Sequence, residues 1–295
     1  MDTIERLLLV DGHHLFHRTY NALPQSIVGT DGAPIQGVYG FAGAFLRLAR
    51  RFSPTHVCVP FNPPGPPFRR AFYPDYRTGR PRGTPKEVAN FDRQVAQVGQ
   101  VLDHLEVRHP LVPGFEADDV MGTLATAATT AGLPVTIVSG DRDLLQMVGP
   151  RVDVFMPKGQ EGDLYTPAVM QERWGVWPDQ FTDLKALIGD VSDNIPGVPG
   201  DRPQDRRSPA GPSRHGRRAL RGPPVAADTP GRSAARIRSA SPSIVAWSPS
   251  SPPWTSRPTW RGIAGPASSR GRRARCSPRL VCVAEVAGVG VRTRG

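Results

Sequence analysis

Eight carboxylates within the first 200 residues fall into four groups, each where a buried strand should end or a helix begin. The groups are Asp11; Glu116, Asp118 and Asp119; Asp141 and Asp143; and Asp190 and Asp193. Carboxylate oxygens are the ligands that Mg²⁺ and Mn²⁺ prefer in proteins. Two such ions, about 4 Å apart, activate a water and stabilise the leaving oxygen of a phosphodiester. The acids therefore predict metal-assisted hydrolysis of a phosphate ester.

Each acidic group also has a purely structural interpretation. Acids in the first turn of a helix often cap it or complement its dipole. Residues 141–143 would then be an ordinary turn, and residues 190–194 a loop of turn-forming side chains. Four such groups in this order make the structural interpretation the weaker one. A Walker phosphate loop, a GxSxG elbow and an HExxH motif are absent, and His13, His14 and His17 match no metal motif.

The elements that must position these acids follow from hydrophobic periodicity. Apolar side chains recur every three or four residues from Val88 to Leu105 and again after Asp119, which predicts two amphipathic helices. Four short apolar runs read as buried strands, and they cover residues 7–10, 56–59, 135–138 and 152–155. Apolar strands that alternate with helices predict an α/β fold with a mostly parallel sheet, covered by helices on both faces.

Three polar side chains follow three of these strands directly or closely. They are Asp11, Asn62 and Asp141. Ligands of open α/β sheets bind outside the carboxyl ends of the strands, so we expect these side chains at one edge. Glu116 and its neighbours begin a helix that can start on the same edge. The sequence thus predicts one metal-binding edge of the sheet.

Arginines alternate with aromatic residues between Phe68 and Arg82, inside a long connection of residues 63–87 that begins with prolines and glycines. Guanidinium groups and aromatic rings in this mixture suit phosphate contacts and base stacking. Long irregular connections inside compact domains are usually functional. A solvated loop with no ligand is the alternative interpretation.

Charge divides the chain into two unlike parts, although the whole chain has a net charge of +11. Residues 201–295 carry 19 arginines, no lysine and four acids, a net charge of +15, so residues 1–200 carry −4. The basic balance therefore gives no evidence for nucleic-acid binding by the first part. Residues 201–295 also contain 13 prolines and 13 serines but only two leucines, which predicts an irregular, disordered tail.

Cysteine usage and hydropathy indicate the compartment. The three cysteines, Cys58, Cys276 and Cys282, form no CxxC pair and no disulfide framework. No apolar run approaches the roughly 20 residues that a membrane helix needs, and the first ten residues do not resemble a signal peptide. We therefore expect a cytoplasmic protein without membrane association.

Five ordered motifs resemble one known family, the 5′–3′ exonuclease domain of bacterial DNA polymerase I, within the flap endonucleases. The resemblance covers nearly all of residues 5–200. It implies a PIN-like fold and an activity that cleaves 5′ flaps and 5′ ends of DNA. We expect a monomer and no polymerase or proofreading domain in this chain. The motifs are Leu8–His14, Val38–Phe41, Gly114–Val120, Ser139–Leu144 and Gly189–Val198.

The resemblance also implies a role for each site residue. Residues 68–86 would form the family's helical arch, which threads the 5′ single strand. Two divalent ions, Mg²⁺ or Mn²⁺, would share the acids. The first ion would take Asp11, Glu116 and Asp118, and the second Asp141, Asp143 and Asp190, with Asp119 and Asp193 assisting. In the arch, Arg69, Arg77, Arg80 and Arg82 would contact phosphates, and Tyr73 and Tyr76 would stack on bases.

One departure from the family concerns Asn62, which stands where the family has an aspartate. An amide oxygen can bind a metal ion but brings no charge, so we predict a weakened first metal site and reduced activity. The substitution Asn62→Asp is expected to raise both Mn²⁺ affinity and the rate of flap cleavage. Measurement of both quantities tests this, and a variant that gains in neither contradicts it.

A second departure begins after Gly200, where the family continues with a Gly-Ile-Gly-x-Lys-Thr-Ala signature that opens a DNA-binding helix–turn–helix. Residues 200–207 can be encoded by GGG GAT CGG CCC CAA GAC CGC CGC, and deletion of one G yields Gly-Ile-Gly-Pro-Lys-Thr-Ala. We therefore hypothesise a frameshift near codon 200, which also explains the tail's composition. The nucleotide sequence of the gene is the test, and codons that exclude this recovery refute the hypothesis. A basic arm that binds DNA non-specifically is the alternative.

Two other classes of protein share parts of this pattern. A catalytically impaired relic that binds DNA weakly would retain the acids yet carry Asn62 and lack the helix–turn–helix. A toxin-like ribonuclease of the PIN fold uses the same acids but is shorter and has no arch. The leading prediction is a structure-specific 5′–3′ exonuclease and flap endonuclease in residues 1–200, acting on DNA with 5′ single-stranded ends or flaps.

Overall fold

A computed structural model describes residues 5–78, 83–159 and 161–197. The tail predicted over residues 201–295 lies outside these residues, as do Arg80 and Arg82. No helix in the described part of the chain is long and apolar enough to span a membrane.

A five-stranded sheet forms the centre of the fold, in the order β2-β1-β3-β4-β5. The first four strands in this order pair in parallel, and β5 pairs antiparallel with β4 at the edge. All four residues of β1 and of β3 are buried, as expected for strands covered on both faces. The strands are β1 (Leu7–Val10), β2 (His56–Cys58), β3 (Val135–Val138), β4 (Val152–Lys158) and β5 (Glu161–Tyr165).

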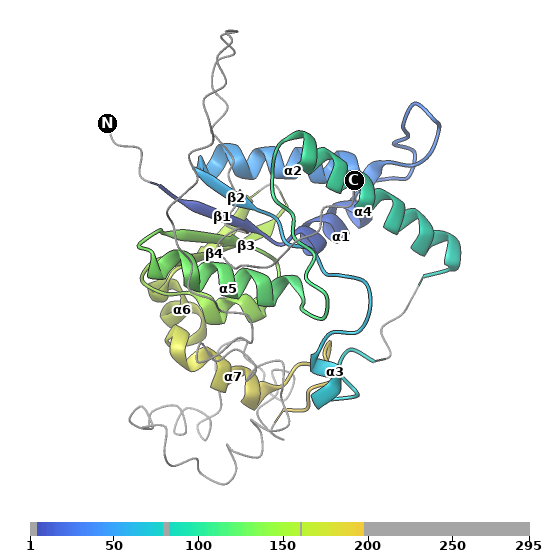
Figure 1. The fold of residues 1–295 in the computed structure, drawn as a ribbon. Helices are drawn as coiled ribbons and strands as arrows, with labels where there is room; N and C mark the ends of the chain where they lie inside the picture. The colour runs from blue at the N-terminus through green and yellow to red at the C-terminus, as the bar shows by residue number, and fades with distance from the viewer. Residues whose placement is uncertain (1–4, 79–82, 160, 198–295) are drawn as a thin grey trace.

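Helices cover both faces of this sheet (Figure 1). One apolar core joins even-numbered β1 residues such as Leu8 to α1, α2 and α4, and the other joins odd-numbered ones such as Leu9 to α5, α6 and α7. The helices are α1 (Gly12–Ala22), α2 (Gln36–Phe52), α3 (Arg69–Phe72), α4 (Pro85–His104), α5 (Ala117–Thr130), α6 (Pro167–Trp174) and α7 (Phe181–Ile188), with the short 3₁₀ segments η1 (Arg142–Met147) and η2 (Pro178–Gln180).

The predicted α/β fold with a mostly parallel sheet is confirmed, and the four predicted strands are those observed. The prediction omitted β5, whose sequence Glu-Gly-Asp-Leu-Tyr has little apolar character because it lies at the edge of the sheet. In the segment expected to form the arch, the described helical parts are the four residues of α3 and the start of α4. Thr84 and Glu87 form a reciprocal capping box that starts α4.

Candidate metal centre

Two neighbouring parallel strands bring the first acids together. Val10 and Val138 are partners at the ends of β1 and β3, so the residues that follow them emerge side by side. Ser139 links the two ends, because its hydroxyl donates to Asp11 Oδ2 (2.8 Å) and accepts from the backbone N–H of Asp141 (3.0 Å). Sequence reasoning missed Ser139, although its place directly after a buried strand and two residues before Asp141 was a usable signal.

Several of the predicted ligands also cap helices. Asp11 is the N-cap of α1 and accepts from the N–H of His14 (2.8 Å), and Asp141 caps η1 through the N–H of Asp143 (2.9 Å). Glu116 is the N-cap residue of α5. The structural interpretation of these acids is therefore correct as far as it goes. It does not replace the metal interpretation. The positive ends of several helices can hold carboxylates close together, and carboxylates that lie close together can share a metal ion.

The carboxyl groups lie close enough to disturb one another. Burial raises the pKa of Asp118 well above its usual range, and the charges of Asp141, Asp11 and Glu116 raise it further. Burial also raises the pKa of Asp11, to which the Asp141 charge adds. Like charges gathered in a poorly solvated place favour protonation or a bound cation. This set of oxygen donors fits a divalent metal ion.

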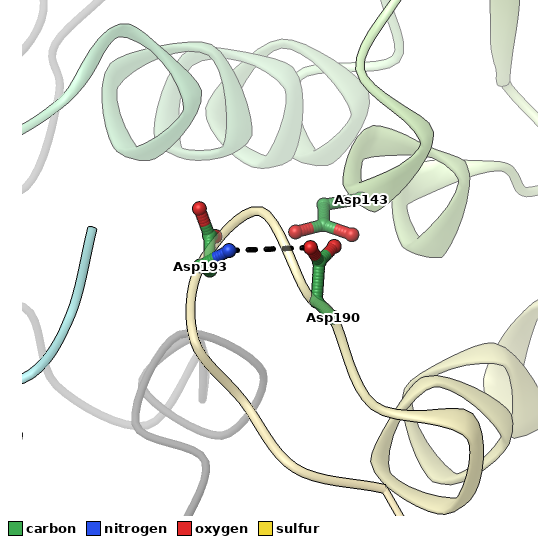
Figure 2. Close-up of side chains that lie close together, drawn as sticks. All are labelled: Asp143, Asp190 and Asp193. Carbon is green, nitrogen blue, oxygen red and sulfur yellow. Dashed lines mark hydrogen bonds between the residues drawn. The ribbon is translucent and has the colours of Figure 1, made fainter. Parts of the chain in front are cut away.

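A second cluster consists of Asp143, Asp190 and Asp193, which each offer one carboxylate oxygen within 4.8 Å of the others (Figure 2). Asp143 comes from η1, and the other two come from the loop after α7. The N–H of Asp193 donates to Asp190 Oδ1 at 3.3 Å, which holds the loop closed. Three carboxylates this close together form a set of oxygen donors that suits a divalent metal ion.

Lys185, which sequence reasoning missed, lies between Asp143 and Asp190 of this second cluster. Its ammonium is 2.8 Å from Asp143 Oδ1 and 2.8 Å from Asp190 Oδ2, and its side chain is 11% exposed. Burial opposes the charge of Lys185, but the two carboxylates raise its pKa. The signal in the sequence was a lysine between the apolar residues Leu184 and Ala186, five residues before Asp190.

Arg69 and Tyr76, which were expected to contact DNA, lie among the acids at the start of α5. Both are buried, with exposures of 6% and 2%. The Arg69 guanidinium donates to both oxygens of Asp119 (2.8 and 2.7 Å) and to Glu116 (3.1 Å), and the Tyr76 hydroxyl donates to Glu116 (2.9 Å). Buried carboxylates at the start of α5 therefore engage both donors in this structure, and a DNA contact by Arg69 or Tyr76 stays a prediction.

The remaining predicted residues of the arch lie near the acids or outside the described part. Arg77 forms ion pairs with Glu116 and with Asp193, the latter at 2.9 Å, and keeps 18% of its side chain exposed. The Tyr73 hydroxyl donates to the backbone oxygen of Asn194 (2.7 Å). These contacts join the segment after α3 to the loop after α7, which sequence reasoning had treated separately.

Asn62 holds the start of α5. Its Oδ1 accepts from the N–H of Ala117 at 2.7 Å, beside Glu116. Asp119 is also bound by protein groups. Its carboxylate accepts a hydrogen bond from the Glu116 N–H (2.9 Å) and pairs with Arg69. The structure therefore gives Asn62 and Asp119 positions next to the predicted ligands, with their oxygens engaged by protein groups.

A cavity of about 970 Å³ opens beside these acids. Its wall combines the proline-rich residues 63–67 with Arg70 and Arg77 and with the aromatic ring of Phe91. His13 also lines it, and burial, followed by the charges of His17 and Arg77, lowers the pKa of His13 to about 4. His13 is therefore neutral at physiological pH and leaves the arginines as the cations of this wall.

The model of the 5′–3′ exonuclease N-terminal, resolvase-like domain matches residues 6–175, and the chain belongs to this family. DNA polymerase I of Thermus filiformis, a thermostable enzyme, is 44% identical over 196 residues. That of Mycobacterium tuberculosis is 40% identical over 197 residues. The alignments cover 66% of this chain but 22% and 21% of the relatives, so the chain spans about a fifth of their length.

Solved structures show the same fold. The T5 D15 protein crystallised with metal ions has a TM-score of 0.59 and 19% identity, covering 82% of this chain and 86% of that one. The T5 D15 flap endonuclease in a pseudo-enzyme-product complex with DNA and metal ions also has a TM-score of 0.59, at 20% identity and the same coverage. These likenesses confirm the predicted PIN-like α/β fold.

The position of Lys185 leads to a prediction about the metal-free protein. Lys185→Met is expected to lower the free energy of unfolding by about 3 kcal/mol at pH 7, because two buried carboxylates lose their counter-charge. Burial and Asp141 raise the pKa of Asp143 to about 6. Asp143 therefore contributes stability that is fully present when the pH is below its ordinary pKa and is lost as the pH rises through about 6. The charge of Lys185 offsets this loss at neutral pH. The loss is expected to be smaller at pH 4.5.

Urea unfolding in the presence of EDTA at both pH values measures this difference. Lys86→Met is the matched control, because Lys86 is an exposed residue of α4. An equal loss at both pH values for Lys185→Met, or no loss at all, would contradict the assigned role.

Proposed function

We propose that this protein is a metal-dependent 5′ nuclease that hydrolyses phosphodiester bonds of DNA at 5′ ends and 5′ flaps. The observation that carries the proposal is the meeting of two acidic clusters at one edge of the sheet. Asp11, Asp118 and Asp141 interact electrostatically in the first cluster, and Asp143, Asp190 and Asp193 form the second. Asp141 and Asp143 come from the same short segment and connect the two.

Two divalent ions, Mg²⁺ or Mn²⁺, are the proposed cofactors. Asp11, Glu116 and Asp118 would hold the first, with Asn62 beside it, and Asp141, Asp143 and Asp190 would hold the second, with Asp119 and Asp193 assisting. When bound, the ions supply an activated water and charge stabilisation at the phosphate. The chain's own part is to fix the carboxylates, which Ser139 does for Asp11 and Lys185 does for Asp143 and Asp190.

The proposed partner is DNA with a 5′ single-stranded end or flap. The cavity of about 970 Å³ borders Glu116 and has Arg70, Arg77 and Phe91 on its wall, a mixture suited to phosphates and bases. Arg77 remains a proposed phosphate contact because part of it is exposed. Tyr73, Arg80 and Arg82 remain proposed DNA contacts from the family resemblance. The T5 flap endonuclease of similar fold was crystallised with DNA and metal ions, which supports this proposal.

A second candidate is an impaired relic that binds DNA but does not cut it. The observation that favours it is Asn62, an uncharged amide beside Glu116 whose oxygen accepts a hydrogen bond from the start of α5.

The family match ends at residue 175, and the alignments with the polymerases cover 66% of the chain. This fits the proposed division into a nuclease domain of residues 1–200 and a separate segment of residues 201–295.

A cleavage assay on a 5′-flap DNA separates the two candidates. The full chain with Mg²⁺ or Mn²⁺ is expected to release the flap, and EDTA is expected to abolish the release. Asp141→Ala is expected to lower the rate about hundredfold, because it removes a proposed metal ligand whose charge acts on both clusters. Asp163→Ala is the control, since Asp163 lies on the edge strand β5 and pairs with Arg173.

Failure of the wild-type chain to cut with either metal would contradict the nuclease proposal. Flap binding measured by fluorescence anisotropy would then test the relic. If Asp141→Ala and Asp163→Ala behaved alike in the cleavage assay, the assigned acidic clusters would be wrong.

A further inference from the structure

Two distant segments of the chain are tied together next to the second acidic cluster. We call residues 73–78 the arch base and residues 190–194 the metal loop. Figure 1 shows α3, which the arch base follows, beside the chain that continues from α7. The side-chain amide of Asn194 donates to the backbone oxygens of Asp75 (2.9 Å) and Thr78 (2.9 Å) and to the Thr78 hydroxyl (3.0 Å). In return, the Tyr73 hydroxyl donates to the Asn194 carbonyl (2.7 Å).

The backbone of the metal loop aims this amide. Asn194 has φ = 60°, a left-handed conformation that asparagine tolerates better than most residues. Asp190 and Ile195 exchange backbone hydrogen bonds of 2.9 and 2.7 Å across the loop, which closes it into a tight turn. Glycine would also accept this φ, but it has no amide to reach the arch base. The residue type is therefore matched to both the conformation and the contacts.

A second connection between the same segments consists of charges. Arg77 pairs with Asp193, a member of the second acidic cluster, and with Glu116. A cation bound by these carboxylates competes with the guanidinium for the same oxygens. The Asn194 amide donates to neutral carbonyl and hydroxyl oxygens, none of which is a proposed metal ligand. A bound metal ion would therefore not compete with these hydrogen bonds. The neutral contacts can therefore persist when the charged ones are exchanged.

We infer that Asn194 is a positioning residue that holds the arch base in a fixed place relative to the metal loop. It does so while Arg77 exchanges its carboxylate partners for DNA. The inference rests on the proposed nuclease function, because it assigns to Asn194 the alignment of the 5′ strand with Asp190 and Asp193. Asn194 acts through the backbone of residues 75–78 and touches neither substrate nor metal ion. The alternative is a surface turn whose amide only stabilises the fold.

Hydrogen exchange of the full chain without metal ions or DNA tests the connection itself. Asn194→Asp keeps the side-chain size but loses the two N–H donors of the amide. Asn194→Gly keeps the left-handed backbone but removes the whole side chain. Both variants are expected to speed exchange in peptides covering the arch base about tenfold, because about three hydrogen bonds are lost. Val191→Gly is the matched control, since Val191 lies in the same loop and is 79% exposed. Unchanged exchange in both Asn194 variants would overturn the inference.

Cleavage kinetics on the 5′-flap DNA with Mn²⁺ test the functional half. In Asn194→Gly, kcat is expected to fall about tenfold with KM within about twofold, because the DNA still binds but is misaligned with the acids. Mn²⁺ affinity is expected to stay within about twofold, because Lys185 and Ser192 still hold Asp190. Faster exchange with unchanged kcat would overturn the positioning role. If the wild-type chain cut no DNA, the nuclease proposal would fail, and the exchange experiment alone would decide whether Asn194 ties the segments.

Discussion

The concentration of negative charge at one edge of the sheet is the constraint on which the rest of this structure depends. Asp11, Asp118 and Asp141 approach one another where strands β1 and β3 end, and burial raises the pKa of the first two. Such a cluster destabilises a folded chain unless cations or hydrogen-bond donors surround it. Helix starts, a buried hydroxyl, a lysine and two arginines provide that surrounding here.

The same groups that stabilise the acids also fix where they lie. Backbone N–H groups hold one oxygen of Asp11 and one of Asp141, and the Ser139 hydroxyl connects the Asp11 carboxylate to the backbone N–H of Asp141. Capping and the proposed metal binding are therefore compatible uses of the same side chains. A preorganised set of oxygens lowers the cost of ordering ligands when an ion binds, which is what a metal-dependent hydrolase requires.

The arginines of the segment after α3 have two possible sets of anionic partners, the acids of the protein and the phosphates of DNA. In this structure Arg69 and Arg77 bind Glu116, Asp119 and Asp193. Arg69 is enclosed, whereas Arg77 lies on the wall of the large cavity. If the proposed metal ions bind these carboxylates, they compete with the guanidinium groups, which would connect the metal centre to the segment proposed to bind DNA.

The sequence by itself determined the parallel sheet, the strand ends and the acids that meet there, because hydrophobic periodicity and strand-end position are local properties of the chain. It also predicted the family through five ordered motifs. Only the tertiary structure decided which charges pair. Arg69 binds Asp119 from 50 residues away, and Lys185 reaches Asp143 from a different helix. Nothing local distinguishes a buried arginine from a DNA-binding one, since that choice depends on which carboxylates the fold brings within reach.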